Sequence, residues 1–202
     1  PQTNHAFNYA TGTGVKRSGK RLLTVGTDCS VGKMYTSLSL ERAMKATGMD
    51  ADFVATGQCG ILIAGTGIAI DCVVADFISG AAEALSPNAE AQHWAIIEGQ
   101  GSLSHPAFAG VSLGLLHGSQ PDAIVICHGL KATHMRGLPG SPLPSIEQTI
   151  GLNLSAAKLT NPAAKVVGIS VNTSSVSVAE GQIICAQLSE QFGIPCADPV
   201  RE

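Results

Sequence analysis

A phosphate-binding motif lies near the N-terminus, where the sequence reads Gly26-Thr-Asp-Cys-Ser-Val-Gly-Lys33. An apolar run ending at Val25 precedes this segment, and a helical pattern follows it. Between a strand and a helix, such glycines let backbone N–H groups wrap a phosphate, while the lysine and the helix N-terminus supply positive charge. We predict a P-loop with nine ligand contacts: Gly26, Thr27, Asp28, Cys29, Ser30, Val31, Gly32, Lys33 and Met34. The alternative is a tight turn with a solvated lysine.

The motif departs from the standard P-loop at two positions. Five residues, not four, separate Gly26 from Gly32, and Met34 stands where the standard motif has a magnesium-binding Ser or Thr. Thr36 is the candidate substitute for the missing hydroxyl, from the next turn of the expected helix. The sequence therefore favours phosphate binding over metal-dependent phosphoryl transfer.

A carboxylate follows a second apolar run, where Trp94-Ala-Ile-Ile97 leads into Glu98 and a glycine-rich turn ending at Ser102. Ligands of open α/β sheets lie at the carboxyl ends of strands, so Glu98 has three candidate roles: magnesium ligand, base, or orienting group for an amine. The alternative is a carboxylate tied to backbone N–H groups of the turn. Asn172 ends another apolar run, in a position that can approach the base of a nucleotide.

Two long loops, 102–119 and 129–145, are rich in Gly, Pro and His. In the second loop, the guanidinium of Arg136 is placed to clamp a carboxylate, and a solvent-facing arginine is the alternative. Gln58 lies in a glycine-bounded turn after an apolar run. The histidines, including His105, His117 and His134, lack zinc-site spacing, so we predict no metal site.

The composition indicates one α/β domain, because 202 residues with 45% hydrophobic content can bury a full core. A formal net charge of −3 argues against nucleic-acid binding, and no apolar run is long enough to span a membrane. Six cysteines without a C-x-x-C pair predict reduced thiols and a cytoplasmic location. Charged residues supply only 13% of the chain, which suggests a homo-oligomer or a partner domain.

Short apolar runs alternate with helical patterns, as in a P-loop type three-layer fold with a mostly parallel sheet. The expected strands are Arg21–Val25, Ala51–Ala55, Trp94–Ile97, Ala123–Cys127 and Lys165–Val171. The expected helices are Lys33–Ala46, Asp71–Leu85, Ser145–Ala157 and Ser177–Phe192.

With these residues identified, the chain resembles the C-terminal P-loop domain of the bacterial D-glutamate N-acetyltransferase (DgcN) family. Beyond the P-loop, the resemblance runs through Ala55-Thr-Gly-Gln58, Glu98-Gly-Gln-Gly-Ser102, His117-Gly118 and Asp198-Pro-Val-Arg201. Members of that family carry a smaller Rossmann-like domain in front. We therefore expect residues 1–20 to be a linker or edge segment and residues 21–202 to be the P-loop domain, with a possible contact to a domain that this chain lacks.

This resemblance implies acetyl transfer from acetyl-CoA to the α-amine of an acidic amino acid, D-glutamate. It implies that the P-loop and Asn172 hold the CoA phosphates and nucleotide. Our hypothesis gives the base role to Glu98 or His117 and the oxyanion role to backbone N–H groups of residues 99–102. The other acceptor contacts are assigned to Arg136, Gln58, Ser102 and His134.

A weaker similarity links the P-loop and the Glu98 turn to dethiobiotin synthetase, which uses ATP and magnesium. Two alternatives therefore stay open: an ATP- and magnesium-dependent kinase or ligase, and a nucleotide-binding module that is inactive without its N-terminal domain.

Overall fold

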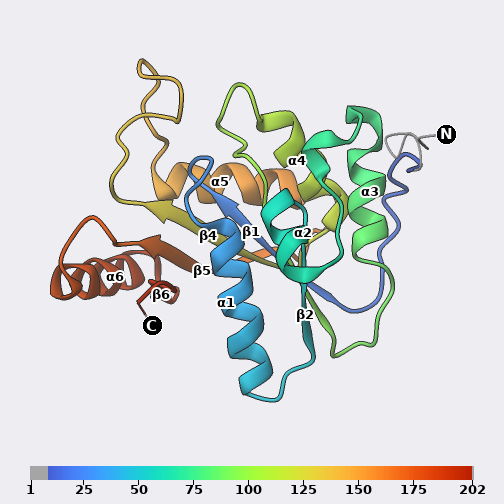
Figure 1. Ribbon diagram of the computed structural model, residues 1–202, viewed down its shortest axis with the longest axis horizontal. Helices are drawn as coiled ribbons and strands as arrows, with labels where there is room; N and C mark the ends of the chain where they lie inside the picture. Colours follow the sequence, from blue (N-terminus) through green and yellow to red (C-terminus); the bar gives the residue numbers. More distant parts are fainter. Residues whose placement is uncertain (1–8, 202) are drawn as a thin grey trace.

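The computed structural model describes residues 9–201, and these form a three-layer α/β domain around a parallel sheet (Figure 1). The strand order is β2-β3-β1-β4-β5-β6, and every neighbouring pair is parallel. The strands are β1 (Lys20–Gly26), β2 (Ala51–Val54), β3 (Trp94–Ile97), β4 (Ala123–Gly129), β5 (Lys165–Asn172) and β6 (Cys196–Ala197). This order puts β1, which leads into the P-loop, between β3 and β4.

Helices cover both faces of the sheet (Figure 1). They are α1 (Lys33–Ala46), α2 (Gln58–Ala64), α3 (Ile78–Leu85), α4 (Ala109–Ser119), α5 (Ile146–Ala157) and α6 (Val178–Phe192), with 3₁₀ turns η2 (Ile70–Cys72) and η3 (Ala75–Phe77). Because side chains alternate along a strand, adjacent residues enter different cores. Leu22 packs in the core that Leu40 and Met44 of α1 cover, whereas Leu23 packs in the larger core beneath α3, α4 and α5.

The fold class and five expected strands are confirmed, with small changes at the strand ends. The sixth strand, β6, is too short to leave a sequence pattern. The expected helix Asp71–Leu85 is wrong over its first half, because η2 and η3 precede α3 there. The sequence predicts a turn at α2 and part of a loop at α4, whereas both segments are helical.

The second half of the 102–119 segment is helical for a reason that lies in α3. A Cβ atom at Gly114 would meet the Ile78 side chain, and one at Gly118 would meet the Ser79 carbonyl oxygen. The glycines of α4 therefore permit close packing of two helices. Because glycine has a low intrinsic helix propensity, the sequence pattern does not indicate a helix at α4.

The described part of the N-terminal segment, residues 9–19, contains no helix or strand but is attached to the domain. The Glu83 carboxylate accepts hydrogen bonds from the backbone N–H groups of Thr13 and Gly14. The Arg17 guanidinium donates to the carbonyl oxygens of Ser86 and Gly118. Residues 1–8 lie outside the described residues. None of the described helices has the length and apolar character needed to cross a bilayer.

Candidate functional site

The loop between β1 and α1 presents a row of unpaired backbone donors. The N–H groups of residues 30–34 have no acceptor among the described residues. Ser30 (φ 58°) and Gly32 (φ 99°) adopt left-handed conformations, which turn the chain into the helix that begins at Lys33. Converging N–H groups at a helix N-terminus form an anion site.

Lys33 adds a buried positive charge to this anion site. Its side chain is only 7% exposed, and its Nζ atom donates a 2.9 Å hydrogen bond to the Asp28 carbonyl oxygen. Burial lowers the pKa of Lys33 below its ordinary value, although the nearby Cys127, Cys29, Asp28 and Glu98 oppose that shift. A phosphate beside Nζ would replace the hydration that the ammonium group has lost.

The Thr36 hydroxyl does not face the anion site. It donates to the Gly32 carbonyl oxygen at 3.0 Å and lies 2.8 Å from the Ser170 hydroxyl, where it fastens α1 to β5. Met34 instead lines a cavity beside the loop. The expected substitute for the magnesium-binding hydroxyl therefore has a structural role.

Two cavities flank the P-loop. The first, of about 600 Å³, lies toward β3 and is called the β3-side cavity; it is lined by Cys29, Ser30, Gly32, Lys33, Met34, Tyr35, Asp71, Glu98, Gly99, Gln100, Gly101, Phe108, Val111 and Arg136. The second, of about 370 Å³, lies toward β5 and is called the β5-side cavity; it is lined by residues 28–31, residues 129–132, His134, Arg136, Asn172, Ser174 and Ser175. Loops that follow different strands therefore line a cavity on each side of the P-loop anion site.

Glu98 is both tied to backbone donors and part of the β3-side cavity. Its side chain is buried, and Oε2 accepts 3.0 Å hydrogen bonds from the N–H groups of Thr56 and Gly57. Its Oε1 atom has no hydrogen bond among the described residues. The two readings of Glu98 are therefore compatible, because one oxygen fixes the carboxylate and the other is free for a ligand.

Gly60 makes room for this carboxylate. A Cβ atom at position 60 would overlap Glu98 Oε2. We expect Gly60→Ala to displace Glu98 and to lower the free energy of unfolding by about 1–3 kcal/mol, the range for overpacking. Urea denaturation would measure this. The control is Gly151→Ala in α5, where a Cβ atom meets nothing within 4 Å. It should be neutral or stabilising by up to about 1 kcal/mol, and equal stabilities of the two variants would contradict the prediction.

The turn after Glu98 offers fewer free donors than expected. The Gly99 N–H donates to the Thr24 hydroxyl at 3.0 Å, which removes it from the expected oxyanion donors. Ser102 is buried outside the β3-side cavity and accepts a hydrogen bond from the Ser104 N–H. The N–H groups of Gln100 and Gly101 have no acceptor among the described residues, and both residues line the cavity.

Arg136 is held by its backbone and leaves its guanidinium free. Its N–H donates to Asp28 Oδ2 at 2.7 Å, and its carbonyl oxygen lies 3.0 Å from His105 Nε2. The guanidinium has no hydrogen bond or ion pair among the described residues, and the residue lines both cavities. The backbone thus anchors a permanently charged side chain beside the P-loop.

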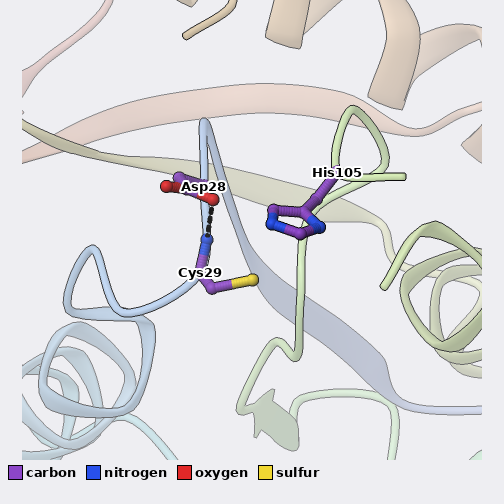
Figure 2. A group of neighbouring side chains, drawn as sticks. All are labelled: Asp28, Cys29 and His105. Atoms are coloured by element: carbon purple, nitrogen blue, oxygen red, sulfur yellow. Dashed lines mark hydrogen bonds between the residues drawn. The ribbon is translucent and has the colours of Figure 1, made fainter. Parts of the chain in front are cut away.

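Figure 2 shows the side chains of Asp28, Cys29 and His105 as neighbours. Each offers one potential metal-ligand atom, and these atoms lie within 4.8 Å of one another. The ring of His105 is already used, because the Ala107 N–H donates to Nδ1 and leaves Nε2 to donate to the Arg136 carbonyl oxygen. Both oxygens of Asp28 accept backbone hydrogen bonds, from Cys29 and Arg136. Burial raises the pKa of Cys29. We interpret the cluster as a network that joins three loops.

The structure does not bring all the expected site residues together. His117 lies in the last turn of α4, where Nε2 is 3.1 Å from the Ala156 carbonyl oxygen, and it lines neither cavity. Gln58 begins α2 and is exposed outside both cavities. His134 and Asn172 line the β5-side cavity, away from Glu98.

Asp71 is a further site residue, which the sequence predicts only as the first residue of the helix Asp71–Leu85. The structure places it in η2, at the wall of the β3-side cavity. Its carboxylate has no hydrogen bond or ion pair among the described residues. The irregular path of residues 65–77, which brings Asp71 to the P-loop, has no local sequence signal.

Comparison with known proteins identified a family and two named relatives. Residues 8–202 match a family described as a domain of unknown function, DUF1611_C, P-loop domain. A D-glutamate N-acetyltransferase from Pseudoalteromonas sp is 75% identical over 194 residues, 96% of this chain and 58% of the relative. A protein of the same name from Tritonibacter scottomollicae is 48% identical over 196 residues, 97% of this chain and 59% of the relative. The chain thus spans less than two thirds of these relatives.

Solved structures give the same picture of the fold. A crystal structure of a DUF1611 family protein from Anabaena variabilis is 36% identical, with a TM-score of 0.89 over 96% of this chain and 58% of that one. A nucleotide-binding protein from Archaeoglobus fulgidus, in complex with ADP, has a TM-score of 0.58 at 13% identity, covering 89% of this chain and 80% of that one. At 13% identity, the similarity to the Archaeoglobus protein supports a shared fold and nothing more.

Proposed function

This chain belongs to the DUF1611 P-loop domain family, and we propose that it is the P-loop part of an N-acetyltransferase that moves an acetyl group from acetyl-CoA to the α-amine of D-glutamate. Two relatives, of which it spans 58% and 59%, are named D-glutamate N-acetyltransferase. The proposal assigns this reaction to the surfaces around the P-loop.

One observation carries the proposal: an anion site lies between two cavities and lacks a hydroxyl after its lysine. The free N–H groups of residues 30–34 and the Lys33 ammonium suit a diphosphate. Met34 occupies the position of the usual magnesium ligand, and Thr36 is bonded elsewhere. Acetyl-CoA is held by its phosphates but reacts at a distant thioester. Such a ligand needs a phosphate-binding site that lacks the usual magnesium ligand.

We assign the chemistry of acetyl transfer to groups that line the β3-side cavity. The neutral amine nitrogen bonds to the thioester carbonyl carbon and releases one proton to Glu98, the carbon–sulfur bond breaks, and the CoA thiolate takes up that proton. Glu98 Oε1 accepts the proton of the amine, and Asp71 supplies a second negative charge for the ammonium form. The N–H groups of Gln100 and Gly101 stabilise the oxyanion. Arg136 binds an acceptor carboxylate.

A binding and activity assay tests this function. Acetyl-CoA at 100 times its Kd should stabilise the chain by about 2.7 kcal/mol, and magnesium-ATP should not raise the melting temperature. CoA release in the presence of D-glutamate, compared with L-glutamate, measures turnover, with the full-length Pseudoalteromonas relative as the control. Hydrolysis and stabilisation by magnesium-ATP, without any effect of acetyl-CoA, would favour the kinase or ligase alternative. Binding without turnover, beside an active relative, would indicate a binding module.

A further inference from the structure

The β5-side cavity is left unused by the acetyl-transfer chemistry. Three segments that are distant in the sequence form it: the P-loop, the 129–136 segment after β4, and residues 172–175 after β5. In Figure 1 these last two segments, gold and orange-red, lie on the side of the P-loop opposite α2. The volume of about 370 Å³ lies within the range of small-molecule sites.

The charges around this cavity favour an anion. Neither the Lys131 ammonium group nor the Arg136 guanidinium has a hydrogen bond or ion pair among the described residues. Asp28 is the acidic residue in the lining, and both of its carboxylate oxygens already accept backbone N–H groups. Lys131 is therefore an unpaired cation in the lining of a cavity whose acidic residue is engaged, and Arg136, which the proposed function assigns to the acceptor carboxylate, adds to the positive charge there.

The remaining lining suits a nucleoside. Asn172 Oδ1 accepts a hydrogen bond from the Ser174 N–H, which orients the amide and leaves its two N–H donors free. Ser174 and Ser175 also line the cavity, and their hydroxyl groups have no hydrogen-bond partner among the described residues. Amide and hydroxyl groups can form hydrogen bonds with the edge of a heterocyclic base and with the hydroxyl groups of a ribose.

We propose that the β5-side cavity binds the adenosine 3′-phosphate half of CoA, and that Lys131 pairs with the 3′-phosphate. This inference rests on the proposed function, in which the P-loop holds the diphosphate. In CoA the diphosphate joins this nucleotide to the pantetheine arm. A P-loop with a cavity on either side therefore directs the nucleotide to the β5 side and the thioester toward Glu98. Lys131 is then a specificity residue that distinguishes CoA from ligands without a 3′-phosphate.

Calorimetric titration with CoA and with 3′-dephospho-CoA tests this assignment. The unmodified chain should bind CoA about 10-fold more tightly than 3′-dephospho-CoA, because a charge-assisted contact is lost without the 3′-phosphate. Lys131→Met should bring this ratio close to one by weakening CoA binding alone. Lys131→Glu should reverse the preference, and raising the salt concentration should reduce each difference.

The matched control is Lys158→Met, at the exposed C-cap of α5, which should keep the ratio of the unmodified chain. Thermal melts of each variant separate altered binding from altered folding. If both ligands bind but Lys131→Met keeps the original ratio, the 3′-phosphate assignment is overturned and the proposed function stands. If neither ligand binds the unmodified chain, both proposals fail.

Discussion

Replacing Glu98 by glutamine is expected to lower kcat for acetyl transfer by about 10²- to 10⁴-fold, the usual contribution of a general base. Glutamine preserves the shape of the side chain, and its carbonyl oxygen can still accept the N–H groups of Thr56 and Gly57. Glu98 lines the β3-side cavity, and the amide nitrogen would replace Oε1, the oxygen without a hydrogen bond among the described residues. Because an amide cannot accept the ammonium proton, the loss should fall on the chemical step.

The binding of acetyl-CoA separates this role from a structural one. Its Kd should stay within about twofold of the unmodified value, because Glu98 does not contact the phosphates in the proposed arrangement. Glu190→Gln, on the exposed surface of α6, is the matched control and should leave kcat unchanged. Initial rates of CoA release give kcat, and calorimetry gives Kd. Unchanged turnover in Glu98→Gln would remove Glu98 from the mechanism.

Lys33→Met should weaken acetyl-CoA binding by about 10- to 100-fold, because hydrogen bonds to charged groups contribute about 1.5–3 kcal/mol and 1.4 kcal/mol is tenfold in affinity. Burial lowers the pKa of Lys33, so its ammonium form is lost at a lower pH than that of an ordinary lysine. Affinity should therefore decline as the pH rises through that lowered pKa, and binding at that pH should take up protons. Calorimetry in buffers of different ionisation enthalpy measures both effects.

The stability of the ligand-free variant is part of the same test. A desolvated ammonium group is costly, so methionine at position 33 should leave the melting temperature equal or higher, provided that the loop keeps its shape. Lys165→Met, at the opposite end of the sheet from the P-loop, is the control and should bind acetyl-CoA normally. An unchanged Kd in Lys33→Met would show that the phosphates do not lie on the P-loop.

Local signals predicted the elements that depend on neighbouring residues. The expected helices at 145–157 and 177–192 are present, and each opens with a capping box, Ser145–Gln148 and Ser177–Glu180, that is completed within four consecutive residues. The five expected strands were also identifiable locally, because each is a run of consecutive, mostly apolar residues. The helix α4 escaped prediction, since the partner that makes Gly114 and Gly118 favourable is α3, more than thirty residues earlier.

The sequence by itself determined the P-loop, the parallel α/β fold and the position of Glu98 at the end of a strand, because strand, turn and helix follow one another there. Only the tertiary structure decided which groups meet at that loop. Asp28 and Arg136 are 108 residues apart, and the order β3-β1-β4 makes their loops neighbours. The same order directs Asp71 to one side of the loop and Lys131 to the other. Contacts between distant segments depend on strand order, which no local pattern encodes.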